Sequence, residues 1–107
     1  MTWLSPDQLT KSQTRDMKEL HHRAHKLVLK EGKPSGWGCY FEREDVLISW
    51  NGTNESSLMV KLLVPVNLTP IVYVWHINGD VSVCPLSLKP TLDKLRRFEV
   101  LDDLASI

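Results

Sequence analysis

The chain has 107 residues, of which 42% are hydrophobic and 24% charged, and its 13 Lys and Arg residues balance 13 Asp and Glu residues. This composition is typical of a globular protein and excludes an intrinsically disordered chain. The balanced charge excludes a strongly basic nucleic-acid-binding tail and an acidic nucleic-acid mimic. No apolar run approaches the roughly 20 residues that a membrane-spanning helix needs. We therefore expect a single domain over residues 1–107, without a membrane segment.

The first predicted element is a helix that begins after Ser5. The segment Ser5–Gln8 combines an N-cap residue, a proline at the first helical position and the glutamine of a capping box. The helix should end before Gly32 and Pro34, and a break at Ser12–Thr14 is an alternative because both ends of that segment can cap a helix. Its apolar side has helical spacing and consists of Leu9, Met17, Leu20, Ala24, Leu27 and Val28.

The opposite side of this helix carries positive charge. Residues 1–33 hold seven Lys and Arg against four Asp and Glu, whereas residues 34–107 hold six against nine. A row of cations along a helix can bind phosphate, which makes nucleic-acid binding an alternative function. The other interpretation is a solvent-exposed face with i,i+4 ion pairs. The candidate nucleic-acid-binding residues are Lys11, Arg15, Lys18 and Lys26.

The middle of the chain predicts an antiparallel sheet of four to five strands. A tight turn at Asn51-Gly52 would pair apolar with polar side chains. A longer loop over Asn51–Ser57 instead builds one apolar face, and we prefer that register. The longer loop pairs Trp50 with Leu58, Ile48 with Val60 and Val46 with Leu62. The expected strands are Trp37–Glu42, Val46–Trp50, Leu58–Val64, Ile71–Ile77 and Val81–Cys84.

The dipeptide Asn78-Gly79 predicts a two-residue type I′ hairpin between the last two strands. This register places Ile77 opposite Asp80, so that Tyr73, Trp75 and Ile77 share one face of the sheet. Something must cover that face: the C-terminal helix, another copy of the chain or a partner protein. We therefore predict Tyr73, Trp75 and Ile77 as the partner-binding residues. The opposite face would consist of Val72, Val74, Val81 and Val83.

The last predicted element is a helix that begins near Pro90-Thr91. Its apolar side consists of Leu92, Leu95, Phe98, Leu101, Leu104 and Ala105. The fold class is therefore α+β, with an N-terminal helix, an antiparallel sheet of four to five strands and a C-terminal helix. A strongly curved or barrel-like sheet is the alternative architecture.

One segment suggests an enzyme. Ser-Gly-Trp-Gly-Cys at Ser35–Cys39 resembles the nucleophile segment of the autophagy-related cysteine peptidases. That resemblance implies Cys39 as a nucleophile, and His76 could then serve as its base. A nucleophilic cysteine of this kind commonly opens a helix, which lowers its pKa, whereas the residues after Cys39 predict a strand. We therefore expect no catalytic site, and a small thiol or histidine enzyme is the remote alternative.

The histidines and cysteines give no metal signature. His21 and His25 have a spacing that can hold a metal ion, but no C-x-x-C or H-E-x-x-H pattern supplies further ligands. We expect no metal and no cofactor. Cys39 and Cys84 form no disulfide framework and the N-terminus has no secretory signal, which predicts a cytoplasmic protein with reduced thiols.

The predicted function is based on the aromatic sheet face and on the lack of a convergent catalytic set. We expect a non-catalytic protein-binding module, such as a small accessory, adaptor or inhibitor protein. Its partner would be another protein or a second copy of the same chain, which would make a homodimer.

Overall fold

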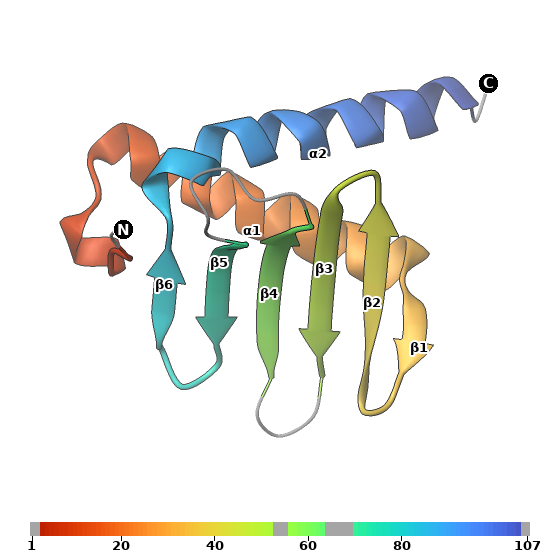
Figure 1. Ribbon diagram of the computed structural model, residues 1–107, viewed down its shortest axis with the longest axis horizontal. Helices are drawn as coiled ribbons and strands as arrows, with labels where there is room; N and C mark the ends of the chain where they lie inside the picture. The colour runs from red at the N-terminus through yellow and green to blue at the C-terminus, as the bar shows by residue number, and fades with distance from the viewer. Residues whose placement is uncertain (1–2, 53–55, 64–69, 106–107) are drawn as a thin grey trace.

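The computed structural model describes residues 3–52, 56–63 and 70–105. The strands form one antiparallel sheet in the order β1-β2-β3-β4-β5-β6, so that neighbours in the chain are neighbours in the sheet (Figure 1). The predicted α+β fold is confirmed, with the short strand β1 in addition to those expected. The elements are a 3₁₀ turn η1 (Pro6–Gln8), α1 (Lys11–Glu31), β1 (Lys33–Ser35), β2 (Gly38–Arg43), β3 (Val46–Asn51), β4 (Ser57–Leu62), β5 (Ile71–His76), β6 (Val81–Val83) and α2 (Pro85–Ala105).

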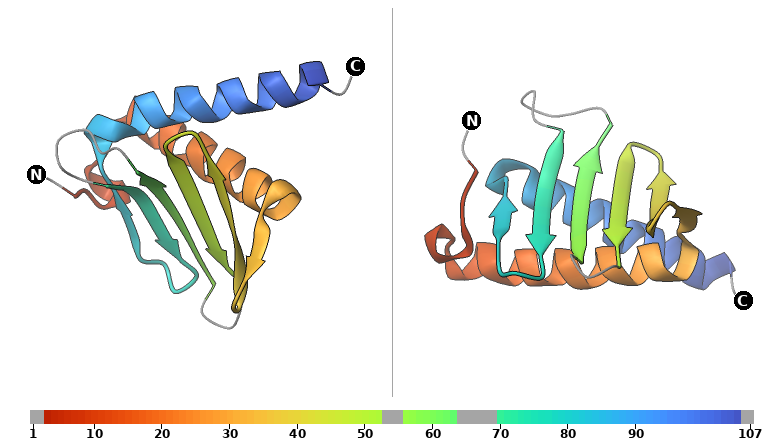
Figure 2. Two further views of the ribbon diagram at one scale, coloured as in Figure 1. Left: turned by 45° about the vertical axis from the view of Figure 1, so that its right-hand side comes forward. Right: turned by 90° about the horizontal axis from the view of Figure 1, so that it is seen from below.

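The two helices cover one face of an open sheet. Helix α1 crosses behind the strands and α2 runs along their upper ends, as the further views also show (Figure 2). Side chains of both helices and of alternate strand positions are buried between the layers; Leu20, Ile48 and Phe98 have no exposed surface. The other face carries the row Tyr40, Ser49, Met59, Val74 and Ser82, which are cross-strand partners.

Helix α1 buries the predicted stripe but begins later than predicted. Met17, Leu20, Ala24, Leu27 and Val28 are all buried. Ser5–Gln8 forms only a single 3₁₀ turn, and the chain is extended at Leu9 before Thr10 caps α1. The Thr10 hydroxyl accepts a hydrogen bond from Gln13 N at 3.1 Å, and Gln13 Oε1 accepts one from Thr10 N at 3.0 Å. The predicted capping box of Ser5 and Gln8 forms as well but starts only the 3₁₀ turn, so the break lies before Ser12–Thr14.

Helix α2 begins at Pro85, five residues before the predicted start, and Pro90 lies inside it. A proline removes one backbone hydrogen bond from the helix, which here affects the carbonyl of the exposed Leu86. Leu88 and Leu92 are buried on the sheet side of the same turns. Their burial holds the first turns in helical form, so that tertiary packing overrides the local preference.

The β3–β4 register is the one that the longer loop predicts. Trp50 lies opposite Leu58, Ile48 opposite Val60 and Val46 opposite Leu62. The strand ends differ from the expected ones by about one residue, and the predicted end at Val64 lies outside the described residues.

The β5–β6 hairpin differs from the prediction by one residue of register. Trp75 lies opposite Val81 and Tyr73 opposite Val83. His76 N donates to Asp80 O at 2.9 Å, so three residues form the loop, with Gly79 at a φ of +103°. The side chain of Asn78 accepts a hydrogen bond from Asp80 N at 3.0 Å, which favours this wider turn over the type I′ turn. A one-residue shift moves every side chain to the other face.

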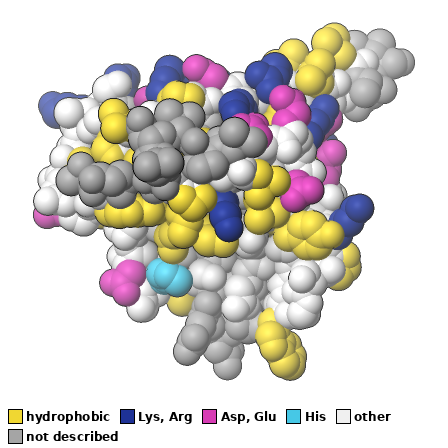
Figure 3. Space-filling model, viewed as in Figure 1, with side chains coloured by type: hydrophobic (Ala, Val, Ile, Leu, Met, Phe, Trp, Pro, Cys, Tyr) yellow, Lys and Arg dark blue, Asp and Glu magenta, His cyan; other side chains and the backbone are white. Residues whose placement is uncertain are grey.

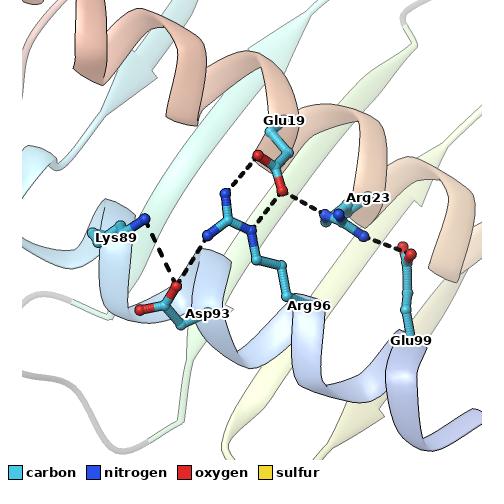
Figure 4. Close-up of polar contacts among 6 residues, drawn as sticks. All are labelled: Glu19, Arg23, Lys89, Asp93, Arg96 and Glu99. Carbon is cyan, nitrogen blue, oxygen red and sulfur yellow. Dashed lines mark hydrogen bonds and ion pairs between the residues drawn. The ribbon is translucent and has the colours of Figure 1, made fainter.

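Charged side chains join the two helices on the rim of the core (Figure 4). Glu19 on α1 accepts two hydrogen bonds from Arg96 on α2 and one from Arg23, each at 2.7 Å. Arg23 also reaches Glu99 at 2.6 Å, and Arg96 reaches Asp93 at 3.3 Å. The two bonds between Arg96 and Glu19 are bidentate, and this geometry links α1 to α2 directly.

Replacing Glu19 with glutamine is expected to lower the unfolding free energy at pH 7 by about 1–2 kcal/mol, since hydrogen bonds to charged groups contribute this much when solvent partly screens them. The hydrogen bonds from Arg96 and Arg23 lower the pKa of Glu19 from 4.5 to about 2. The wild-type advantage should therefore disappear as the pH falls from about 4.5 to about 2. Urea unfolding across this range, with Glu42→Gln on the exposed sheet face as control, measures it. Equal effects of both variants would contradict the role of the network.

Candidate functional site

The shifted hairpin register turns Tyr73 and Trp75 toward α1, together with Val81 and Val83. Tyr73 is only 2% exposed, Trp75 is half-buried and Ile77 in the hairpin loop is 60% exposed. Val81 and Val83 therefore share a face of the sheet with Tyr73 and Trp75, and the predicted separation of the two sets is wrong. The helix that packs on Tyr73 and Trp75 through ring contacts is α1, not the C-terminal helix.

Histidines and aromatic rings pack together beneath α1. His21 Nδ1 lies 2.8 Å from the Tyr73 hydroxyl, and the His21 ring centroid lies 5.2 Å from that of Trp75 in an edge-to-face contact. One helical turn later, His25 lies 4.5 Å from Trp50. The rings of Trp50 and Trp75 are stacked at 6.1 Å across β3–β5. Such pairs stabilise beyond the area that they bury, so this cluster holds α1 on the sheet.

A groove opens at the end of this cluster, between α1 and the β5–β6 hairpin. Its volume is about 300 Å³, near the lower limit for a site that takes a small molecule or a side chain. The groove brings Tyr73 and Trp75, predicted as partner-binding residues, together with Lys18 of the predicted basic row. The residues that line it are Met17, Lys18, His21, Tyr73, Trp75 and Val81.

The electrostatics of the groove are set by one cation on an apolar wall. Burial raises the pKa of the Tyr73 hydroxyl, so that it stays protonated at neutral pH. Burial also lowers the pKa of His21, and the neighbouring His25 and His22 lower it further. Lys18 is exposed at the rim, and no carboxylate is among the described lining residues. The groove can therefore take an apolar group next to a negative charge.

The His21 environment predicts an acid-sensitive fold. Because the pKa of folded His21 lies below its usual value of 6.5, the unfolded chain takes up the proton first. Stability should be complete above pH 6.5 and should decline as the pH falls through that value. Denaturant unfolding at pH 7.5 and 5.5 should show a smaller decline for His21→Gln than for the wild type. His22→Gln, at an exposed position on the same helix, should retain the wild-type decline; an unchanged decline in His21→Gln would contradict the assignment.

The predicted basic row lies on the solvent side of α1. Lys11, Arg15, Lys18 and Lys26 are all exposed. No ion pair within the described part of the chain joins any of them to a carboxylate. The cations at the α1–α2 and α2–sheet contacts are instead paired: Arg23, Arg43, Lys94, Arg96 and Arg97. The chain is neutral overall, but its unpaired positive charge is concentrated on one helix face.

Cys39 and His76, the residues suggested for an enzyme, both line a hollow on the open face of the sheet but come from strands that are not neighbours. Cys39 on β2 faces the helices, and its thiol donates to Val28 O at 3.5 Å. His76 on β5 is exposed and is partnered with Ser57. Strands β3 and β4 lie between the two residues, which places them roughly 14 Å apart at the usual spacing of strands. A base this far from a thiol cannot take its proton directly.

Within the described residues, no group of three or more His, Cys, Asp or Glu side chains is arranged to hold a metal ion. His21 and His25 contact each other and aromatic rings, with 6.0 Å between their own ring centroids. Neither of the two long helices described here has a stretch long and apolar enough to cross a membrane.

The hollow on the open face of the sheet has a volume of about 330 Å³. It is lined mainly by uncharged side chains, among them the 84% exposed Trp37 and the partly exposed Tyr40 and Met59. Figure 3 shows this face, where hydrophobic side chains gather across the middle above mostly uncharged polar groups and backbone. No sequence signal pointed to this surface, because Trp37 looked like a residue at the entrance of a strand.

The groove residues that sequence reasoning missed are Met17, His21 and Val81. Their signal was present but ambiguous: Met17 and His21 lie four residues apart, at the border between the apolar stripe and the basic row of α1. Only the position of α1 across β5 shows that this border faces a groove. No protein-family model matches this chain, and neither the curated proteins nor the solved structures include a significant match.

Proposed function

We propose that this protein is a non-catalytic protein-binding module, an accessory, adaptor or inhibitor protein whose contact site is the groove between α1 and the β5–β6 hairpin. One observation carries the proposal: the half-buried Trp75 forms an apolar wall directly beside the exposed Lys18. Aromatic side chains in partly covered pockets are the usual anchors of protein interfaces.

The non-catalytic character is supported by the contact that two polar groups of the groove make with each other. The Tyr73 hydroxyl and His21 Nδ1 lie 2.8 Å apart, so these two polar groups already have a partner within the chain. Cys39 and Cys84 form no disulfide with each other, in agreement with the reducing cytoplasm that we propose as the location. A second copy of the chain is a further candidate occupant of the groove, which would make a homodimer.

Nucleic-acid binding is the second candidate function, because the exposure of Lys11, Arg15, Lys18 and Lys26 favours it. Four unpaired cations on one helix face release counterions when they meet phosphates, which drives binding at low salt. Aromatic side chains do not alternate with these cations along α1, so the row offers charge without a stacking platform for bases.

The test is a comparison of three affinity baits in nuclease-treated native extract: the wild type, Lys18→Glu and Lys33→Glu. Lys33 is exposed on the edge strand β1, outside the groove, so Lys33→Glu makes the same charge change elsewhere. We expect a protein that the wild type and Lys33→Glu retain and that Lys18→Glu loses. Identical protein sets on all three baits would overturn the proposal. If the baits retain proteins from untreated extract but not from nuclease-treated extract, the result would support the nucleic-acid alternative instead.

A further inference from the structure

The groove and the basic row belong to one continuous surface of α1. Lys18 lies at the rim of the groove, and Arg15 and Lys11 follow on the same helix face toward the N-terminus. At a rise of about 1.5 Å per residue, Arg15 lies roughly 4.5 Å and Lys11 roughly 10 Å from Lys18 along the helix axis. The apolar wall of the groove is therefore followed along α1 by three cations. A bound segment of a few extended residues is long enough to reach all of them.

Two acidic residues of α1, Asp16 and Glu19, interact with cations at the contact between the helices. Glu19 is bound by Arg96 and Arg23, and the charge of Asp16 acts on Arg96. These carboxylates neutralise cations of the helix–helix contact and leave Lys11, Arg15 and Lys18 uncompensated. The nearest acid in the hairpin, Asp80, is engaged by the side-chain amide of Asn78 at 3.2 Å.

We infer that the partner presents an acidic segment with an apolar anchor: one large apolar side chain enters the groove, and carboxylates within the next few residues meet Lys18, Arg15 and Lys11. This inference rests on the proposed function. The groove of about 300 Å³ has room for a single anchor, and the positive charge on its rim selects negative charge in the residues next to that anchor. The basic row chiefly raises the rate of association and discriminates between partners. The Trp75 wall chiefly slows the dissociation of the bound partner.

Three fluorescent synthetic peptides of equal length test this inference. The first has an anchor of Leu-Phe-Leu followed by four glutamates, the second has the same anchor followed by four lysines, and the third has three serines followed by four glutamates. Fluorescence anisotropy measures their binding to the wild type, Lys18→Glu, Arg15→Glu and Lys33→Glu. All these side chains are exposed, so the variants keep the folded core.

We expect the anchored acidic peptide to bind at least about tenfold more tightly than either other peptide, which corresponds to about 1.4 kcal/mol. Lys18→Glu should weaken that binding by a similar factor and Arg15→Glu by less, whereas Lys33→Glu should leave it unchanged. Binding should also weaken as salt is raised. Amide chemical shifts should move at Met17, His21 and Val81.

Several results would overturn the inference. Equal binding of the acidic and basic anchored peptides would show that charge does not select the partner. Equal binding of the peptide without an anchor, or full competition by a single-stranded oligonucleotide, would show a general polyanion surface. Equal weakening by Lys33→Glu would show an effect of net charge alone. The peptide and bait experiments together separate the two proposals. If no peptide binds, but the wild-type bait retains a protein that the Lys18→Glu bait does not, only the acidic-anchor inference fails. If no retained protein depends on Lys18, the proposed function fails.

Discussion

Leu20→Ala is expected to lower the free energy of unfolding by about 2–5 kcal/mol, the range for removing a large aliphatic side chain from a close-packed core. Leu20 is 0% exposed and lies between α1 and the sheet, next to Ala24 and Leu27 of the same buried stripe. Leu29→Ala makes the identical change at a position of the same helix that is 56% exposed, and should change stability by less than about 0.5 kcal/mol. Urea unfolding monitored by circular dichroism measures both.

The Leu20 comparison decides whether α1 packs as described. Because both variants remove the same atoms from one helix, differences in helix propensity cancel between them. Equal stability of Leu20→Ala and Leu29→Ala would mean that the predicted stripe is not the core of this protein.

Trp75→Ala is expected to cost about 2–4 kcal/mol of stability, somewhat less than the roughly 3–5 kcal/mol of a fully buried aromatic side chain. Trp75 is half-buried and loses its contacts with His21 and with Trp50 when it is truncated. Trp37→Ala is the matched control, because Trp37 is 84% exposed in the β1–β2 turn. Its effect should stay within about 0.5 kcal/mol.

This result bears on function as well as on folding. An exposed contact residue would change binding but leave the stability of the isolated chain nearly unaltered. If Trp75→Ala is as stable as the wild type, α1 does not cover this residue, and Trp75 would be an exposed contact residue.

Local sequence signals predicted the elements of the fold well. The alternation of apolar residues settles the β3–β4 register, because a shift of one residue would set Lys61 in place of Val60 opposite the buried Ile48. The spacing of Met17, Leu20 and Ala24 predicts the buried side of α1 in the same way. These signals are strong because each is repeated several times along the segment.

The errors occur where one local signal competes with another. Asn78-Gly79 fits a two-residue turn, but the bond from Asp80 N to the Asn78 side chain stabilises a three-residue loop. Likewise, Thr10 and Gln13 form a second capping box close behind the first. In the hairpin the difference is a single residue, yet it moves Val81 and Val83 to the face of Tyr73 and Trp75.

The site could be predicted only in parts. The sequence predicts Lys18 as a nucleic-acid-binding residue and Trp75 as a partner-binding residue, and it gives no link between the two. They lie 57 positions apart in the sequence, and neither helical spacing nor strand alternation relates one element to the other. The direction in which α1 crosses the sheet decides that its Lys18 end meets the β5–β6 hairpin (Figure 2). That direction is set by the whole core, which includes the link from Glu19 to Arg96 on α2.

The groove beside Trp75, and not the open face of the sheet, is the contact site that we propose. Photo-crosslinking tests this most directly, with p-benzoylphenylalanine placed at Lys18 in one sample and at Tyr40 in another, both of which are exposed. Tyr40 lies on the open face and lines its hollow. Irradiation in native extract is expected to give a discrete protein adduct from position 18 and none of that mass from position 40. A discrete adduct from position 40 alone would contradict the proposal and assign the contact to the open face.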